Sequence, residues 1–349
     1  MKIKVSSRLS KKMLHRNYEN ASSELFATVL KANPGEVVCL TGPSRVGKTS
    51  LIEELIKSLT GGVKSKNEDE MTCVSVEAAN NGRNGTFSTK SFVFRILQAL
   101  KHPVYRRERS IQLNESMIYK QYNQMREPRM SSMLEDILIE KNTKYLIIDE
   151  AQHVRYAGRN VSAGSSVMDE FKGWASHVGF VLVLVGAYPI LELIGESPHL
   201  IGRKHQIHFP RYYYEDADLD EFASIIHCFE QELHLHKTID PLTDEIEILY
   251  KGSFGCFGLL ERWLSSAESE GIRKGTGITK EILLRSAMSD FDREKIYREI
   301  SDGENKLRTT DLDVDEDIQG VPKKVPAKKK QKRKPFQKKP QRHKPGNRE

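Results

Sequence analysis

The chain has 349 residues, which is enough for one α/β domain of about 200 residues and a smaller unit. Its hydrophobic share of 38% supports a buried core. The longest purely apolar run, residues 180–185, is far shorter than the ~20 residues of a membrane-spanning helix, and the basic N-terminus lacks the apolar segment of a secretory signal. Four widely spaced cysteines form no C-x-x-C pair. We expect a soluble protein of a reducing compartment.

The positive charge is concentrated at one end of the chain. Residues 321–349 carry ten Lys and three Arg against one Glu, a net charge of +12, and five prolines interrupt the basic runs. Residues 301–320 carry a net charge of −5, so residues 1–300 are neutral overall. Too few apolar residues follow residue 300 to offset the entropy of ordering, which predicts a disordered acidic-then-basic tail over 301–349.

The first part of the chain alternates between helical and extended patterns. Residues 1–20 are polar and basic and are predicted to form an arm. A helix is predicted over 21–32, because its apolar residues share one helical face and a proline and a glycine follow it. A strand at 36–41 then leads into a glycine-rich loop, and an amphipathic helix follows that loop.

The same alternation continues to about the middle of the chain and then stops. Further strands are predicted at 72–77, 145–150, 180–186 and 206–209, with helices at 92–100 and 133–140. Strands that are apolar on both faces are typical of a parallel sheet covered by helices. Helices alone follow, at 219–235, 243–250, 259–268 and 279–300. We predict a doubly wound α/β domain over 21–211 and a small all-α lid over 212–300.

The loop after the first strand fits the pattern G-x-x-x-x-G-K-[ST] without exception. Its glycines let backbone N–H groups converge on a phosphate, and the positive end of the following helix faces the same point. Lys48 is predicted to reach the β- and γ-phosphates of ATP, and the Thr49 hydroxyl to bind Mg²⁺. The residues predicted to hold ATP in this loop are Gly42, Pro43, Ser44, Arg45, Val46, Gly47, Lys48, Thr49 and Ser50.

An apolar strand that ends in two acids provides the second half of such a site. The strand reads YLIID and is followed by Glu150. Asp149 is predicted to hold the Mg²⁺ shell, directly or through water, and Glu150 to orient and deprotonate the attacking water. Because phosphoryl transfer to water needs a positioned base, Glu150 favours ATP hydrolysis over simple nucleotide binding.

Phosphoryl transfer also builds negative charge on the γ-phosphoryl oxygens, which an arginine from a neighbouring subunit can neutralise. Arg203 stands in a basic stretch directly before the last predicted strand, at an edge of the domain. We predict that Arg203 is this catalytic arginine. A solvated basic turn is the alternative.

Together these residues resemble the TniB/TnsC-type AAA+ regulators of DNA transposition, from Glu36 to Tyr214. The resemblance is carried by TGPSRVGKTS, STKSFVFRILQALKHP, YLIIDEAQHV and FKGWASHVGFVLVLVGAYPILELIGESPHLIGRKHQIHF. The sequence DEAQH and the segment SPHL…RK are more specific than the phosphate loop, which many AAA+ proteins share. The basic tail and the length are similar to those of TnsC proteins of CRISPR-guided transposons.

This resemblance implies an AAA+ fold and an ATP- and Mg²⁺-dependent ring or filament of identical subunits around double-stranded DNA in the bacterial cytoplasm. It implies transposase subunits and a TniQ-type target selector with an RNA-guided effector as partners, and no membrane. Two positions depart from the family. Ala187 stands where a small hydroxyl residue often senses phosphate, and Arg262 lies one turn beyond the usual lid arginine. Both departures predict slow hydrolysis.

Basic side chains that line the pore of a ring neutralise duplex phosphates without reading sequence. The predicted DNA contacts are Arg83, Lys90, Arg106, Arg107 and Arg109, each with a solvated helix end as the alternative. The basic tail suits DNA or an acidic partner, although a solubilising role and pairing with the acidic stretch 311–317 stay open. A second function also stays open: a signalling or defence ATPase that acts on protein partners without nucleic acid.

Overall fold

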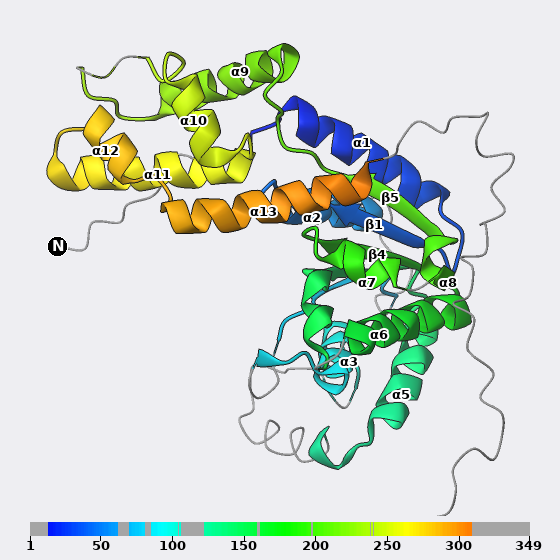
Figure 1. Ribbon diagram of the computed structural model, residues 1–349. Coiled ribbons are helices and arrows are strands. Elements are labelled where there is room, and N and C mark those ends of the chain that lie inside the picture. Colours follow the sequence, from blue (N-terminus) through cyan, green and yellow to red (C-terminus); the bar gives the residue numbers. More distant parts are fainter. Residues whose placement is uncertain are drawn as a thin grey trace, which may run out of the picture. The chain divides into compact units, whose positions relative to one another are not determined.

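The computed structural model describes residues 13–61, 70–80, 85–103, 105, 122–158, 161–196, 198–237, 239 and 241–308. Five parallel strands form one sheet within this part of the chain, in the order β2-β3-β4-β1-β5 (Figure 1). The strands are β1 (Val37–Thr41), β2 (Cys73–Glu77), β3 (Tyr145–Asp149), β4 (Val181–Gly186) and β5 (Lys204–His208). The interior strands β1 and β4 are buried along their whole length, whereas the edge strands β2 and β5 are partly exposed.

Helices cover both faces of this sheet, because alternate residues of each strand point to opposite faces. Val183 of β4 packs with α1 (Arg16–Lys31) and α2 (Lys48–Gly61), whereas Leu184 packs with the helices of the other face. The helical segments of that second face are α3 (Thr89–Ala99), α5 (Glu127–Glu140), η3 (Ala151–Tyr156), α6 (Val161–Trp174), η4 (Ala175–Gly179), α7 (Ile190–Gly195) and α8 (Pro198–Ile201). The predicted α/β fold with a parallel sheet covered by helices is confirmed.

A separate hydrophobic cluster follows the last strand, and its regular elements are helices. Its helices are α9 (Asp216–Glu232), α10 (Ile246–Ser253), α11 (Phe257–Lys274) and α12 (Lys280–Arg285). The indole N–H of Trp263 donates to the carbonyl oxygen of Leu283 at 2.8 Å and so ties α11 to α12. The division of the chain into a nucleotide-binding domain and a lid stays a prediction, but helices occupy the segment assigned to the lid.

The C-terminal helix of the described chain extends further than the sequence predicts. The single helix expected over 279–300 is wrong, because a break after α12 separates it from α13 (Asp290–Leu307). Disorder expected from residue 301 is therefore also wrong for the last turns of α13. Ile300 is buried, and the Glu304 carboxylate accepts from the Arg211 guanidinium at 2.7 and 3.1 Å. Residues 309–349, with most of the predicted tail, lie outside the described residues.

The first helix begins earlier than predicted, at Arg16 instead of Ala21. Its N-cap is His15, whose ring nitrogen accepts from the Tyr18 backbone N–H and lies 2.9 Å from the Tyr212 hydroxyl. Burial lowers the pKa of His15 to about 4, which keeps the imidazole neutral and able to accept these bonds. The last five residues of the predicted arm are thus helical.

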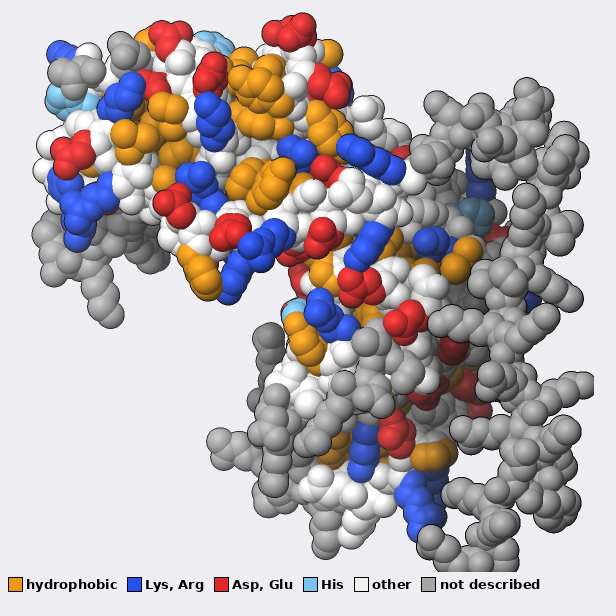
Figure 2. All heavy atoms as spheres, viewed as in Figure 1, with side chains coloured by type: hydrophobic (Ala, Val, Ile, Leu, Met, Phe, Trp, Pro, Cys, Tyr) orange, Lys and Arg blue, Asp and Glu red, His pale blue; other side chains and the backbone are white. Residues whose placement is uncertain are grey.

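The face drawn in Figure 2 carries basic and acidic side chains side by side over the described residues. This mixture agrees with the zero net charge of residues 1–300. Such a face offers duplex phosphates no broad basic surface. Among the helices that the structure describes, none is long and apolar enough to cross a membrane.

Gly303 provides a test of how α13 is held. A Cβ at this position would lie 2.0 Å from Cγ of Tyr188, whose side chain is buried. We expect Gly303→Ala to lower the free energy of unfolding by about 1–3 kcal/mol, the usual cost of overpacking, although alanine is the better helix former.

The matched control is Gly173→Ala in α6, where an added Cβ has no atom within 4 Å. This variant should be neutral or stabilising by up to about 1 kcal/mol. Thermal and urea unfolding of both variants measures the difference, and equal stability of the two would contradict the docking of α13 on Tyr188.

Candidate functional site

The predicted phosphate loop connects β1 to α2 at the carboxyl edge of the sheet. Two of its positions require glycine. A Cβ at Gly42 would lie 2.3 Å from the carbonyl oxygen of Phe209, and Gly47 has a φ of +111°, in a region that side chains disfavour. The loop can therefore curl closely over the sheet, so that the N-terminus of α2 faces the space beside it.

Lys48 is buried beneath this loop, and the loop itself binds its ammonium group. Its Nζ donates to the carbonyl oxygens of Pro43 at 2.8 Å and Gly42 at 3.1 Å. Burial lowers the pKa of Lys48, while the negative charges of Glu150 and Glu299 oppose that shift. A phosphate group would supply the countercharge that this buried cation needs.

Thr49 and Asp149 meet although they are far apart in the sequence. The Thr49 hydroxyl donates to Oδ2 of Asp149 at 3.1 Å, and the backbone N–H of Glu150 donates to Oδ1 at 2.8 Å. Burial raises the pKa of Asp149, ahead of the opposing effect of these bonds. The described residues hold no cluster of three or more His, Cys, Asp or Glu side chains for a metal. One carboxylate and one hydroxyl nevertheless suit Mg²⁺, which takes few protein ligands and completes its shell with phosphates and water.

Glu150 follows β3 in the left-handed region, with a φ of 53°. Non-glycine residues in this region are uncommon and gather at functional sites. The Glu150 side chain is 39% exposed and lines the same cavity as Lys48 and Thr49. Its carboxylate accepts a hydrogen bond from Nε2 of Gln152, and Nε2 of His153 lies 3.9 Å away. The structure thus brings Lys48, Thr49, Asp149 and Glu150 together.

Two adjoining cavities surround the loop. The first, of about 490 Å³, is lined by the phosphate loop, Glu150 and Ala187. The second, of about 390 Å³, lies beside α1, α2 and α11. Residues Gly47, Ser50, Phe257 and Glu261 line both cavities. Since the first cavity contains the phosphate-binding groups, the second offers room for the base and sugar of a nucleotide.

Several residues of this second cavity were missed by the sequence reasoning. They include Met13, His15, Tyr18 and Phe257. The His15 ring stacks on Phe257 with the centroids 4.7 Å apart, and His15 is neutral because of its lowered pKa. An uncharged aromatic wall of this kind suits a planar base. No motif marks these residues, and the helix start at His15 lacks the usual Ser, Thr, Asp or Asn.

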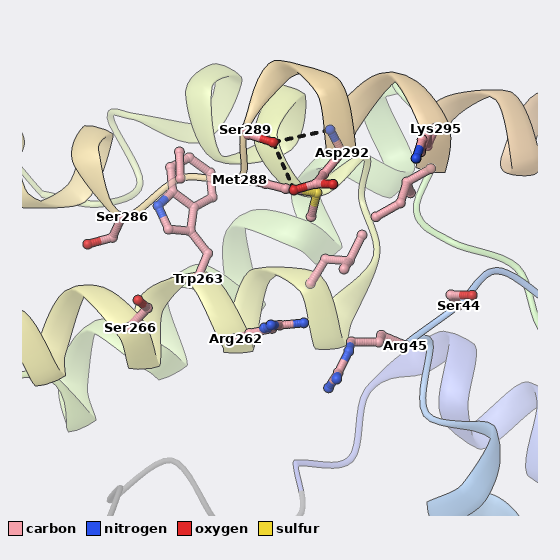
Figure 3. A pocket seen from close by; sticks show the side chains of 14 residues that line it. Ser44, Arg45, Arg262, Trp263, Ser266, Ser286, Met288, Ser289, Asp292 and Lys295 are labelled. Carbon is pink, nitrogen blue, oxygen red and sulfur yellow. Dashed lines mark hydrogen bonds between the residues drawn. The ribbon is translucent and has the colours of Figure 1, made fainter.

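The helix α11 presents different side chains to different cavities. Glu261 lines both nucleotide cavities, whereas Arg262 lines a larger cavity of about 670 Å³ (Figure 3). Figure 3 shows Arg262 and Arg45 on one side of this larger cavity and Lys295 of α13 on another. The cavity includes neither Lys48 nor any residue of the acidic pair. Arg262 therefore shares its cavity with Ser44 and Arg45 of the loop, but not with Lys48 or the acidic pair.

The helix α13 also reaches the phosphate loop. The Ser44 hydroxyl donates to Oε1 of Glu299 at 3.1 Å. At the far end of the helix, Lys306 pairs with Glu192 of α7 at 2.6 Å. The first contact places the Glu299 carboxylate beside the loop, and the sequence predicted no role for this residue.

Arg203 lies at the opposite edge of the sheet from the phosphate loop. The Val37 backbone N–H donates to the Arg203 carbonyl oxygen at 3.2 Å, so Arg203 stands level with the first residue of β1. The loop leaves the other end of this five-residue strand, which at ~3.3 Å per residue is about 16 Å away. Arg203 is exposed and lies well away from the nucleotide cavities of its own chain.

Among the predicted DNA contacts, only Lys90 belongs to the described residues. Its Nζ lies 4.6 Å from the centroid of the Tyr122 ring and donates to the Asn123 carbonyl oxygen at 3.5 Å. The ammonium group is thus partly engaged within the chain. Arg83, Arg106, Arg107 and Arg109 lie outside the described residues.

Two known structures of one protein agree with the fold. The Aeropyrum pernix ORC2 protein in ADPNP–ADP complexes is 16% identical with a TM-score of 0.51, over 86% of this chain and 72% of that chain. The ADP form of the same protein is 14% identical with a TM-score of 0.50, over 81% of this chain and 72% of that chain. The Walker-type ATPase PABY2304 of Pyrococcus abyssi is 17% identical with a TM-score of 0.49, over 86% of this chain and 78% of that chain. At such identities the likeness concerns the fold alone.

Sequence comparison identifies the domain that carries the site. No curated protein matches the chain. Residues 32–194 match the family model described as AAA domain, and this range contains the phosphate loop and the acidic pair. The finer resemblance to transposition regulators has no support from these comparisons. Residues 32–194 thus match an AAA domain that contains the P-loop, and the protein is an ATPase.

Proposed function

We propose that the protein is an oligomeric AAA+ regulator that assembles on double-stranded DNA and links target selection to transposase recruitment. One observation carries the oligomeric part of the proposal. The loop, Thr49, Asp149 and Glu150 line one site, whereas the exposed Arg203 stands about a strand length away from it. Lys48 and Arg45 are the basic side chains that this chain contributes to the cavity, and a second copy would add Arg203 to them.

In this proposal the residues of the site divide the work of hydrolysis. Lys48 binds the β- and γ-phosphates, and Glu150 orients the attacking water and takes its proton. Thr49 and Asp149 hold Mg²⁺, which when bound neutralises charge on the phosphate oxygens. Hydrolysis is slow in the isolated chain, because Ala187 offers the phosphate no polar side chain and α11 presents Glu261 to the cavity instead of Arg262.

The DNA part of the proposal rests on the sequence. The segments DEAQH and SPHL…RK resemble TniB/TnsC regulators, and residues 321–349 carry a net charge of +12. Such a tail attracts duplex phosphates without reading base sequence. From the same resemblance we propose transposase subunits and a TniQ-type selector with an RNA-guided effector as partners. We propose the bacterial cytoplasm as the compartment. Arg83, Arg106, Arg107 and Arg109 are the proposed pore contacts, together with Lys90.

Replacement of Lys48 tests the phosphate site. We expect Lys48→Ala to weaken ATP binding by about ten- to a hundred-fold, because hydrogen bonds to charged groups contribute about 1.5–3 kcal/mol. Equilibrium titration with a fluorescent ATP analogue measures the affinity. Lys251→Ala, which removes an exposed lysine of α10, is the matched control and should bind as the wild type does. Unchanged affinity of the Lys48 variant would contradict the assignment of the loop.

Replacement of Glu150 tests the function on DNA. Glu150→Gln keeps the shape of the side chain but loses the base, so we expect turnover to fall by about 10²–10⁴ while ATP binding persists. The variant should then stay assembled on plain duplex DNA in the presence of ATP. Electron microscopy and sedimentation with and without duplex DNA detect the assembly.

Glu247→Gln, at an exposed position of α10, is the control for this charge change. If neither the wild type with a non-hydrolysable ATP analogue nor Glu150→Gln assembles on DNA, a signalling or defence ATPase that acts on protein partners becomes the better account.

Mixing of two inactive variants tests the catalytic arginine. Arg203→Ala should lower hydrolysis in the assembled state only, because the residue acts across a subunit boundary. An Arg203→Ala subunit keeps an intact loop and a Lys48→Ala subunit keeps an intact arginine, so mixed assemblies should regain activity. A steady-state ATPase assay of the mixtures measures the recovery. Arg273→Ala, at an exposed end of α11, should neither lose nor restore activity. Wild-type turnover of assembled Arg203→Ala would exclude the proposed role.

A further inference from the structure

Gln152 lies two residues after Glu150, in η3, and connects the ends of two strands. Its Oε1 accepts a hydrogen bond from the backbone N–H of Ala187, directly after β4, at 3.1 Å. Its Nε2 donates to the carboxylate of Glu150, directly after β3. One side chain therefore ties the acid of the site to the backbone at the end of the neighbouring strand.

The chemistry of these two bonds suits an amide. A backbone N–H only donates, and an ionised carboxylate only accepts, so the group between them must accept on one side and donate on the other. This requirement also fixes the orientation of the Gln152 amide, since the flipped amide would satisfy neither partner. A glutamate at this position would lose the donor, and a methionine would lose both groups.

The strand β4 ends in a way that leaves room for this amide. A Cβ at Gly186 would lie 2.5 Å from Oε1 of Gln152 and 3.4 Å from its backbone nitrogen. Glycine at this position lets the amide approach the Ala187 N–H directly. Ala187 itself is buried and contributes its backbone, not a polar side chain, to the contact.

Glu150 has few other restraints. Its side chain is 39% exposed, and the His153 ring nitrogen at 3.9 Å is too distant for a hydrogen bond. The left-handed backbone, with a φ of 53°, sets where the side chain starts but not where the carboxylate ends. A base works only within hydrogen-bond reach of the proton that it takes, so the position of the carboxylate limits the rate.

We propose that Gln152 is a positioning residue for ATP hydrolysis. It holds the Glu150 carboxylate in the cavity beside the phosphate loop and anchors it to the main chain at Ala187. The inference rests on the proposed role of Glu150 as the base. Gln152 does not touch the nucleotide in this account and acts through Glu150 alone.

Two substitutions in the full-length protein separate the contributions of the two bonds. Gln152→Met keeps the length of the side chain and removes both bonds. Gln152→Glu keeps the acceptor for Ala187 but removes the donor and places a like charge beside Glu150. We expect kcat to fall about ten- to a hundred-fold in both variants. This fall should not exceed the fall in kcat caused by Glu150→Gln. The dissociation constant of a non-hydrolysable ATP analogue should stay within about threefold of the wild-type value, because neither bond involves the phosphate loop.

The matched control is Gln206→Met. Gln206 of β5 also bridges strands, because its Nε2 donates to Thr41 Oγ1 at 2.8 Å and to the Cys39 carbonyl oxygen at 3.3 Å. It has no bond to Glu150. We expect kcat of this variant to stay close to the wild-type value. An equal loss of kcat in Gln206→Met and Gln152→Met would show a general weakening of the sheet edge and overturn the inference.

A double-mutant cycle gives the decisive readout. Since Gln152 acts through Glu150, adding Gln152→Met to Glu150→Gln should slow turnover no further. Additive losses would overturn the positioning role. The two proposals also fail in different ways. If Glu150→Gln turns over as fast as the wild type, Glu150 is not the base, and the inference fails with that role. If Glu150→Gln turns over slowly while Gln152→Met turns over as fast as the wild type, the proposed function stands and only the inference fails.

Discussion

The parallel register of β1, β3 and β4 determines where the groups of the site can meet. Leu184 of β4 pairs with Cys39 of β1 on one side and with Ile148 of β3 on the other. Because the strands run in one direction and are level with each other, the chain leaves all three at the same edge. The phosphate loop, the acidic pair and the backbone at Ala187 start from this edge. The contact between Thr49 and Asp149 follows from it, although a hundred residues separate the two.

Two close backbone approaches hold the loop at this edge. A Cβ at Gly42 would lie 2.3 Å from the Phe209 carbonyl oxygen, and one at Gly258 would lie 2.3 Å from the Arg45 carbonyl oxygen. The Gly258 N–H also donates to that Arg45 oxygen at 2.9 Å. The start of α11 is thus hydrogen-bonded to the loop, and the Glu299 contact of α13 lies on Ser44 beside it. The loop is therefore in direct contact with helices of the predicted lid.

The sequence was sufficient for the parts of the structure that local patterns determine. The central strands are apolar on both faces, so their runs of Val, Ile and Leu predicted a covered parallel sheet, and the glycine-lysine motif predicted the phosphate loop after β1. The helix start at His15 could not be predicted, because its cap uses a histidine whose partner Tyr212 lies 197 residues away. The last turns of α13 were missed for a similar reason. That helix is poor in apolar residues, and contacts with Tyr188 and Arg211 hold it in place. The role of Gln152 also depends on a tertiary contact, since only the pairing of β3 and β4 brings Ala187 beside it.

The charges around the nucleotide cavities agree with the proposed slow hydrolysis by one subunit. Lys48 is the cation buried at the loop, and it is already bound to loop carbonyl groups. The predicted lid contributes Glu261 to the cavities, while Arg262, one residue on, is turned by the helical repeat of about 100° toward the larger cavity. The Glu299 carboxylate adds a further negative charge next to the loop. Both acids add negative charge beside the loop, and Arg45 offsets part of the charge of Glu261. Arg45 also lines the first cavity, and the proposed Arg203 of a second copy would add a further cation there.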